Sequence, residues 1–280
     1  MESMNTMPGT ASRRAGASTG CLYPARPVEA LRTFLDLGIR KFELFTNTDS
    51  ELRAPYTSQL RALLDEYGAQ AVSIHPYTSG FETNLFFSEY DGRTEDGLRY
   101  YTNYCAAGRA LGARFLTLHG AHYMERPPAG FLQRYARNYA RLARVCADGG
   151  ILLTQENVAV CMSGRAEFIE ALRDELHGDI SFTYDIKHAA RSCDPLRMLQ
   201  AMRGAIVNVH FNDYLYTAGR CAVPFSGETD QHAILAELRA QGYAGDFIVE
   251  VYRDNFQSPQ QIADAVRATE AAVGEEYNKG

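Results

Sequence analysis

Residues 180–211 read ISFTYDIKHAARSCDPLRMLQAMRGAIVNVHF, and this stretch contains the unit from which the whole chain is built. Two short, nearly continuous apolar runs, 180–185 and 206–211, are typical of strands that are covered on both faces. Between them, Asp194-Pro195 indicates a helix start, with a capping side chain followed by a proline in the first turn. A strand, a helix and a second strand in this order predict parallel strands joined by a crossover helix.

The same unit recurs along the chain. The expected strands are Arg14–Thr19, Lys41–Phe45, Ala71–His75, Phe115–His119, Ile151–Glu156, Ile180–Asp185, Ile206–Phe211 and Phe247–Val251. Helical patterns with one apolar face lie between them, such as PVEALRTFLDLG at 27–38. We therefore predict an α/β fold, a single (β/α)8 TIM barrel. An open doubly wound sheet is the alternative, but residues 17–27 (ASTGCLYPARP) lack the glycine-rich phosphate loop that such sheets carry after their first strand.

The chain has 280 residues, close to the roughly 250 that are typical of an eight-fold barrel. We expect residues 1–13 to form a flexible N-terminal segment. Residues 14–280 contain no linker-like stretch, so we expect them to form a single barrel domain.

Composition excludes several classes of protein. With 28 basic and 34 acidic side chains the net charge is -6, so a generally basic nucleic-acid surface is not expected. No apolar run approaches the roughly 20 residues that span a bilayer, and the first residues lack the apolar core of a signal peptide. The six cysteines form no CxxC pair, so a disulfide scaffold is not expected either. We therefore expect a cytoplasmic protein without a membrane partner.

Ionisable side chains stand at or near the end of seven successive expected strands. They are Glu43, His75, His119, Glu156, Asp185, His210 and Glu250. In a parallel barrel the carboxyl ends of the strands converge on one mouth, where active sites lie. Carboxylates and imidazoles gathered there would repel and desolvate one another unless a cation lay among them. The pattern therefore predicts a divalent-metal site.

The expected metal ligands are Glu156, Asp185, His210 and Glu250. Three carboxylates and one imidazole form a hard, oxygen-rich set that suits one divalent ion, with Mn²⁺ expected and Mg²⁺, Co²⁺ or Zn²⁺ as alternatives. Taken singly, a strand-end glutamate is more often a structural residue, so the prediction depends on the joint pattern.

Other candidates are weaker. His177 and His232 lie in helical stretches without a partner pattern and are read as surface residues, whereas the role of His122 is left open. The long segment after the third strand carries aromatic residues that either wall a substrate site or pack on a neighbouring helix. They are Tyr77, Phe81 and Phe86.

Five motifs together resemble the sugar phosphate isomerase/epimerase family. They are ENV (156–158), YDIKHA (184–189), VHFND (209–213), PFSGETD (224–230) and FIVEVY (247–252). That family shares the xylose-isomerase-like barrel with ketose 3-epimerases, inosose dehydratases and apurinic-site endonucleases. The resemblance runs from about residue 14 to the last expected helix.

The resemblance implies that one metal ion is held by the same four residues that the strand-end pattern selects. It further implies that Glu156 and Glu250 are the catalytic acid/base pair and that His188 binds substrate, with Arg220 matched loosely to a substrate-binding arginine. Glu43, His75 and His119 complete the expected substrate-binding set. The partner is then a small sugar or polyol, and the family's habit of pairing through outer helices or loops suggests a dimer or tetramer.

The chain also departs from its relatives. Apurinic-site endonucleases need an Asp-x-His after the seventh strand, where this chain reads Gly219-Arg220-Cys221, so a trinuclear site is not expected. His75, His119 and His188 match endonuclease positions, which leaves a second metal open. The epimerases carry a further acidic residue shortly after the fifth strand, and residues 157–164 (NVAVCMSG) have none.

The resulting expectation is a divalent-metal-dependent isomerase or epimerase that acts on a sugar or polyol-derived ketone through an enediolate. The alternatives are an inosose-type dehydratase, an endonuclease-like phosphodiesterase and a non-catalytic sugar-binding barrel.

Overall fold

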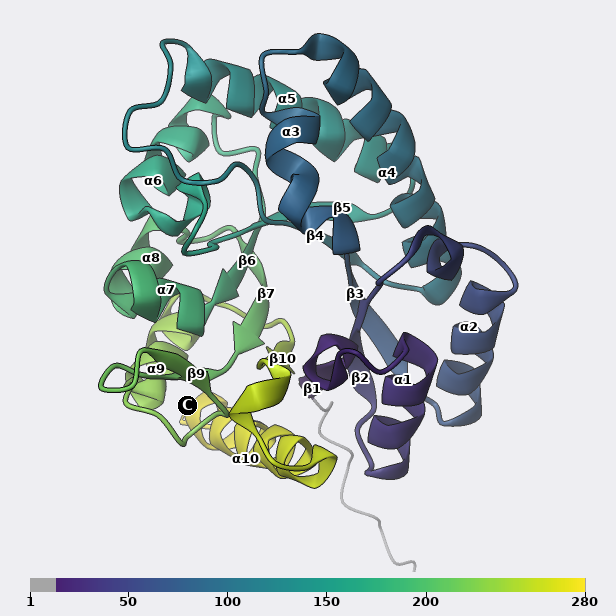
Figure 1. The fold of residues 1–280 in the computed structure, drawn as a ribbon. Helices are drawn as coiled ribbons and strands as arrows, with labels where there is room; N and C mark the ends of the chain where they lie inside the picture. The colour runs from purple at the N-terminus through teal and green to yellow at the C-terminus, as the bar shows by residue number, and fades with distance from the viewer. Residues whose placement is uncertain (1–13, 280) are drawn as a thin grey trace, which may run out of the picture.

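The computed structural model describes residues 14–279, and the expected flexible segment 1–13 lies outside them. Eight parallel strands close into a barrel in the order β1-β10-β7-β6-β5-β4-β3-β2, surrounded by helices (Figure 1). The barrel strands are β1 (Ala15–Ser18), β2 (Lys41–Phe45), β3 (Gln70–His75), β4 (Phe115–Leu118), β5 (Leu152–Glu156), β6 (Phe182–Asp185), β7 (Ile206–Phe211) and β10 (Phe247–Val249). Because β1 pairs with both β2 and β10, the predicted TIM barrel is confirmed and the open doubly wound sheet is excluded.

Helices of very different length connect the strands. They are α1 (Pro27–Asp36), α2 (Tyr56–Glu66), α3 (Glu82–Phe86), α4 (Asp91–Leu111), α5 (Phe131–Asp148), α6 (Ala166–Glu175), α7 (Ile186–Ser192), α8 (Pro195–Ala201), α9 (Gln231–Ala240) and α10 (Pro259–Tyr277). Asp194 caps α8 as predicted, because its side chain accepts a hydrogen bond from the backbone N–H of Arg197 at 3.0 Å. Among residues 14–279, no helix has both the length and the apolar character needed to cross a bilayer.

The structure differs from the expected elements at strand ends and in one connection. Three strands end earlier than expected, β1 at Ser18, β4 at Leu118 and β10 at Val249. His119 and Glu250 are therefore the first residues after β4 and β10. An unpredicted antiparallel hairpin follows β7, formed by β8 (Asp213–Leu215) and β9 (Arg220–Ala222). Strands of three residues are too short to show a period-two pattern, which is why the sequence gives no signal for them.

The barrel interior changes from apolar to polar along its axis. Val72, Phe115 and Ile248 form an apolar cluster of their own with Val207, although these residues come from opposite sides of the ring. Residues on opposite strands can touch only across the interior, so this cluster fills one level of the barrel. The hydroxyls of Thr154 and Thr183, 2.7 Å apart and buried, are paired between β5 and β6. The outward side chains of the strands pack instead against the helices in the main core.

The end of the barrel where the strands begin is closed by an ion-pair cluster. Asp246, which directly precedes β10, accepts hydrogen bonds from the side chains of Lys41 on β2 and Arg114 before β4. The Asp246 side chain is 7% exposed, whereas that of Arg114 is 55% exposed. One buried carboxylate thereby links three segments that are distant in the sequence.

We expect Asp246→Asn to lower the free energy of unfolding by about 2 kcal/mol, because Lys41 would lose its charged partner while the half-exposed Arg114 could turn to water. Asp264→Asn is the matched control, because Asp264 also pairs with an arginine but its side chain is 60% exposed. That control should cost less than about 0.5 kcal/mol. Urea unfolding of the two variants measures the difference, and equal losses would contradict the assignment.

Glu82 at the start of α3 ties together the segments that follow β3 and β4. Its buried carboxylate accepts hydrogen bonds from the backbone N–H of Gly120 at 2.7 Å and from the Tyr101 hydroxyl at 2.9 Å. Gly120 has φ +90°, and a Cβ there would lie 2.1 Å from the Tyr135 hydroxyl, so only glycine fits beside His119. Burial raises the pKa of Glu82 to about 7.

This raised pKa predicts how stability depends on pH. The folded protein holds the proton of Glu82 above the usual glutamate pKa of 4.5, so the stabilising contribution is present at low pH and is lost as pH rises through about 7. Relative to Glu82→Gln, the unfolding free energy of the wild type should fall by up to about 3 kcal/mol between about pH 5 and pH 8. Urea unfolding in the presence of a chelator measures this difference.

Glu89→Gln serves as the control, because Glu89 lies in the same β3–α4 connection with a side chain that is 74% exposed. It should follow the pH dependence of the wild type. A wild-type stability that stays parallel to that of Glu82→Gln over this range would show that the Glu82 proton does not contribute.

Candidate metal centre

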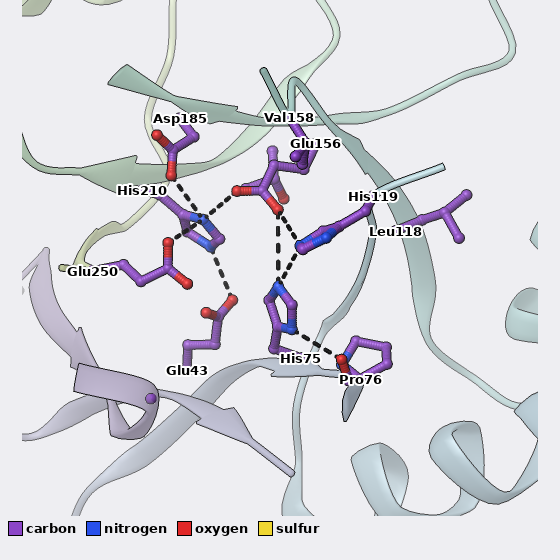
Figure 2. Close-up of polar contacts among 12 residues, drawn as sticks. Glu43, His75, Pro76, Leu118, His119, Glu156, Val158, Asp185, His210 and Glu250 are labelled. Carbon is purple, nitrogen blue, oxygen red and sulfur yellow. Dashed lines mark hydrogen bonds and ion pairs between the residues drawn. The ribbon is translucent and has the colours of Figure 1, made fainter. Parts of the chain in front are cut away.

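The seven strand-end residues selected from the sequence come together at the carboxyl end of the barrel. Figure 2 shows their side chains pointing toward one another. They are Glu43, His75, His119, Glu156, Asp185, His210 and Glu250. All but His119 and Glu250 are buried, and those two are partly exposed. The predicted convergence is therefore confirmed.

His210 is the centre of this cluster. Its Nε2 lies 2.9 Å from Oε2 of Glu43, and its Nδ1 lies 3.0 Å from Oε1 of Glu156. The same Nδ1 lies 3.5 Å from Oδ2 of Asp185 and 3.3 Å from Oε2 of Glu250. Four carboxylates thus face one imidazole, three of them on a single nitrogen.

Mutual charge controls the protonation of these groups. Burial by itself would lower the pKa of His210, but the carboxylates of Glu43, Glu250 and Glu156 outweigh it and hold that pKa well above 6.5. Burial would likewise raise the pKa of Glu156, yet His210, His119 and His75 hold it well below 4.5. The carboxylate of Glu156 is therefore ionised, and the site attracts positive charge.

The donor set fits a divalent ion. One ligand atom from each of Glu156, Asp185, His210 and Glu250 lies within 4.8 Å of all the others. Two buried carboxylate oxygens, Oε1 of Glu43 and Oε2 of Glu156, have no hydrogen-bond donor, although the latter lies 3.1 Å from Nε2 of His119. Buried carboxylate oxygens without a donor are costly, and a cation is the usual remedy. The candidate metal-binding cluster therefore consists of Glu156, Asp185, His210 and Glu250.

A second group of donors adjoins the first and shares Glu156. It consists of His75, His119 and Glu156, whose ligand atoms also lie within 4.8 Å of one another. The Nε2 atoms of the two histidines are 2.9 Å apart, and that of His75 lies 3.8 Å from Oε2 of Glu156. The His75 ring stacks on Phe45 with centroids 4.7 Å apart, which fixes its plane.

Two asparagines that sequence reasoning did not select hold Asp185 in place. The Asn157 side chain accepts from the backbone N–H of Asp185 at 2.7 Å and donates to its carbonyl at 2.9 Å. The Asn212 side chain donates to both carboxylate oxygens of Asp185, at 3.3 and 3.4 Å, and to the carbonyl of Glu250 at 3.1 Å. Both asparagines directly follow strands, in the motifs ENV and VHFND. This position at strand ends is the sequence feature that could have identified them as site residues.

Lys187 is the third unpredicted member of the cluster. It lies in the first turn of α7, is 3% exposed, and its Nζ donates to Oδ2 of Asp185 and, at 2.6 Å, to Oε2 of Glu250. Burial would lower the pKa of Lys187, but the carboxylates of Asp185 and Glu250 hold it well above 10.5. The side chain therefore carries a positive charge inside the candidate metal site.

Of the histidines and the arginine that remain from the sequence analysis, His188 is buried and the others are exposed. The backbone N–H of His188 donates to Oδ1 of Asp185 at 3.0 Å, and its buried Nδ1 has no hydrogen-bond partner. Burial lowers the pKa of His188 to about 4, so the ring is neutral. Arg220 lies exposed at the start of β9. His177 and His232 are exposed, as expected, and so is His122.

Asp213 shapes the segment that follows β7. Its carboxylate accepts hydrogen bonds from the backbone N–H groups of Tyr214, Gly227 and Thr229 at 2.8, 2.8 and 3.1 Å. The hydroxyl of Thr229 adds a fourth donor at 2.6 Å. Asp213, the last residue of VHFND, is therefore a structural residue that holds the motif PFSGETD against β8.

A pocket of about 550 Å³ opens beside the cluster. Glu250 and Lys187 line it together with Tyr23, Phe45 and Tyr252. Its volume suits a small polar molecule held between aromatic walls. The β3–α4 connection contributes no wall here, because Tyr77 hydrogen-bonds Tyr100, Phe86 packs on Tyr101, and Phe81 is 63% exposed. Of the two roles predicted for Tyr77 and Phe86, a substrate wall or packing on a neighbouring helix, the structure shows packing on α4.

Comparison with known proteins identifies the family. No curated protein sequence matches the chain significantly. Among solved structures, an L-ribulose 3-epimerase superposes with a TM-score of 0.78 at 19% identity, over 95% of this chain and 96% of the other. A 3-keto-D-glucoside 4-epimerase from E. coli gives 0.72 at 18% identity, over 91% and 98%. A xylose isomerase-like TIM barrel protein from Mycobacterium smegmatis, in complex with magnesium, gives 0.71 at 14% identity, over 94% and 98%.

Identities this low show only a shared fold. The family is shown by a sequence-family model, described as xylose isomerase-like TIM barrel, which matches residues 31–272. The closed eight-stranded barrel agrees with it. This chain belongs to the xylose isomerase-like TIM barrel family.

Proposed function

We propose that this protein is a divalent-metal-dependent isomerase or epimerase of a sugar or polyol-derived ketone, acting in the cytoplasm. One observation carries the proposal: Glu156 and Glu250 reach the same centre from β5 and from the end of β10, strands separated in the ring by β6 and β7. Two carboxylates that approach one point from different sides can serve a substrate placed between them on opposite faces.

The proposed reaction is a proton transfer at a carbon next to a carbonyl. When bound to Glu156, Asp185, His210 and Glu250, a divalent ion supplies Lewis-acid stabilisation of the charge that develops on the substrate oxygens. One glutamate removes the proton, which gives an enediolate, and the other returns a proton to the opposite face or to the neighbouring carbon. Burial would raise the pKa of both glutamates, but the neighbouring histidines and Lys187 hold it well below 4.5, so either can start as the base. The glutamate that acts as the acid first takes a proton from a substrate hydroxyl or from solvent and then delivers it to carbon.

The surrounding residues suit a polyhydroxylated substrate. His75 and His119 belong to the second donor group, and His188 lies beside Asp185. The ring nitrogens of His75 contact the Pro76 carbonyl and His119, whereas Nδ1 of His188 has no partner and can bind a substrate hydroxyl. Tyr23 and Tyr252, which are 58% and 55% exposed, line the pocket and offer aromatic surface on which the C–H face of a sugar can lie. The structural neighbours named as epimerases of L-ribulose and of a 3-keto-D-glucoside support this class of substrate.

The choice of metal also belongs to the proposal. The hard donor set favours Mn²⁺, with Mg²⁺, Co²⁺ and Zn²⁺ as alternatives, and the neighbour that was solved with magnesium supports a divalent ion. A dehydratase would begin with the same proton removal and then expel a hydroxyl, so product analysis distinguishes it. Phosphodiester cleavage is disfavoured, because residues 219–221 lack the ligands of a third metal.

We expect Glu156→Gln and Glu250→Gln each to reduce solvent-deuterium incorporation into a responsive ketose by at least about 100-fold, because each removes one proton-transfer group. The measurement is NMR of a ketose panel with Mn²⁺-loaded protein. Glu167→Gln is the matched control, since the Glu167 side chain is 79% exposed and should exchange at the wild-type rate. Undiminished exchange in both active-site variants would refute the mechanism, provided that circular dichroism shows intact barrels.

The aromatic wall should affect substrate binding more than chemistry. Tyr23→Ala removes a half-exposed ring that lines the pocket and is not one of the candidate metal ligands. We expect KM for the responsive ketose to rise about fivefold, equivalent to about 1 kcal/mol of lost stacking, with kcat changed less than twofold. Steady-state kinetics test this, and an unchanged KM would remove Tyr23 from the substrate site.

A further inference from the structure

Lys187 is an unusual residue for its position in this chain. The sequence has three lysines against 25 arginines, so cationic side chains are almost always arginine. Lys187 is nevertheless the cation that is buried in the candidate metal centre, at 3% exposure. An ammonium group is a compact point charge on a flexible stem, whereas a guanidinium is a broad planar fork. The position therefore suits a small cation that can move.

Lys187 contacts one carboxylate oxygen on each of two candidate metal ligands. Its Nζ donates to Oδ2 of Asp185 and Oε2 of Glu250. The same two oxygens face Nδ1 of His210, at 3.5 and 3.3 Å, inside the four-residue candidate cluster. An ammonium and a divalent ion cannot both stand against this pair of oxygens, because two cations in a buried, weakly screened site repel strongly.

The lysine also borders an aromatic ring and the open pocket. Lys187 lines the pocket beside the cluster, and its Nζ lies 5.6 Å from the centroid of the Tyr252 ring. A rotation of the four-carbon stem away from Asp185 would carry the ammonium toward this ring and the open pocket. A cation over an aromatic face is stabilised there while it remains accessible to water.

We propose that Lys187 is an internal cation that competes with the divalent ion. In the metal-free protein it holds Asp185 and Glu250 together. An incoming ion displaces it toward Tyr252, and its ammonium then faces the substrate pocket. The metal affinity of this protein is set partly by this displacement, so Lys187 is a positioning residue for the metal centre. The inference rests on the metal site of the proposed function.

The test compares Mn²⁺ affinity among variants by calorimetric titration of chelator-treated protein, without any activity assay. Lys187→Met removes the competing charge and should bind Mn²⁺ at least tenfold more tightly than the wild type. Its metal-free form should melt at a lower temperature, and the rise in Tm on adding Mn²⁺ should be larger. Lys41→Met is the matched control, because Lys41 also forms a largely buried ion pair, with Asp246 at the other end of the barrel. It should lose stability but keep the wild-type affinity.

Tyr252→Leu tests the second position of the lysine in a side chain that is 55% exposed, so the variant should fold even if Lys187→Met does not. Removing the ring should weaken Mn²⁺ binding about threefold when Lys187 is present and should have no effect in the Lys187→Met background. Equal Mn²⁺ affinity in wild type, Lys187→Met and Tyr252→Leu would overturn the inference and leave the metal site intact. Loss of Mn²⁺ binding in all of them would overturn both the inference and the proposed function.

Discussion

The structure depends above all on the crowding of negative charge around His210. Four carboxylates, from Glu43, Glu156, Asp185 and Glu250, lie around one buried imidazole. Such a group is stable only with positive charge among its members, and in the metal-free chain that charge comes from His210 and Lys187. A divalent ion would meet the same demand with one particle. The site therefore favours positive charge, whether it comes from His210 and Lys187 or from a bound ion.

Stability and chemistry occupy opposite ends of the barrel. Where the strands begin, Asp246 joins Lys41 and Arg114, and the apolar cluster around Phe115 fills the interior above them. Where the strands end, buried polar groups replace apolar ones. The crowded carboxylates cost free energy, so the closed ladder and the opposite end must supply the stability that keeps them in place. The same barrel fold is found in structural neighbours that are only 14–19% identical to this chain.

The sequence predicts the barrel and the cluster because both depend on one regular feature, a short apolar run that ends in an ionisable residue. Strand ends in a parallel barrel converge by topology alone, so Glu156, Asp185, His210 and Glu250 could be grouped without knowing any contact. Lys187 could not be found this way. It lies in a helix turn, and its partner Glu250 is 63 positions away, so only the folded chain brings the two together. The same holds for Asn212, whose amide spans Asp185 and the carbonyl of Glu250.

A lysine in the candidate metal centre also bears on which substrates this barrel accepts. The four candidate ligands fix where charge must be neutralised, whereas the cation that shares their oxygens decides how readily an ion enters and what remains facing the substrate. If Lys187 stands over Tyr252 in the metal-bound protein, the pocket gains a positive charge close to Glu250. That charge would favour substrates with an electron-rich oxygen or an anionic group on the side of the ring nearest Tyr252. Substrate preference and metal affinity would then depend on the same side chain, so a change at position 187 would alter both.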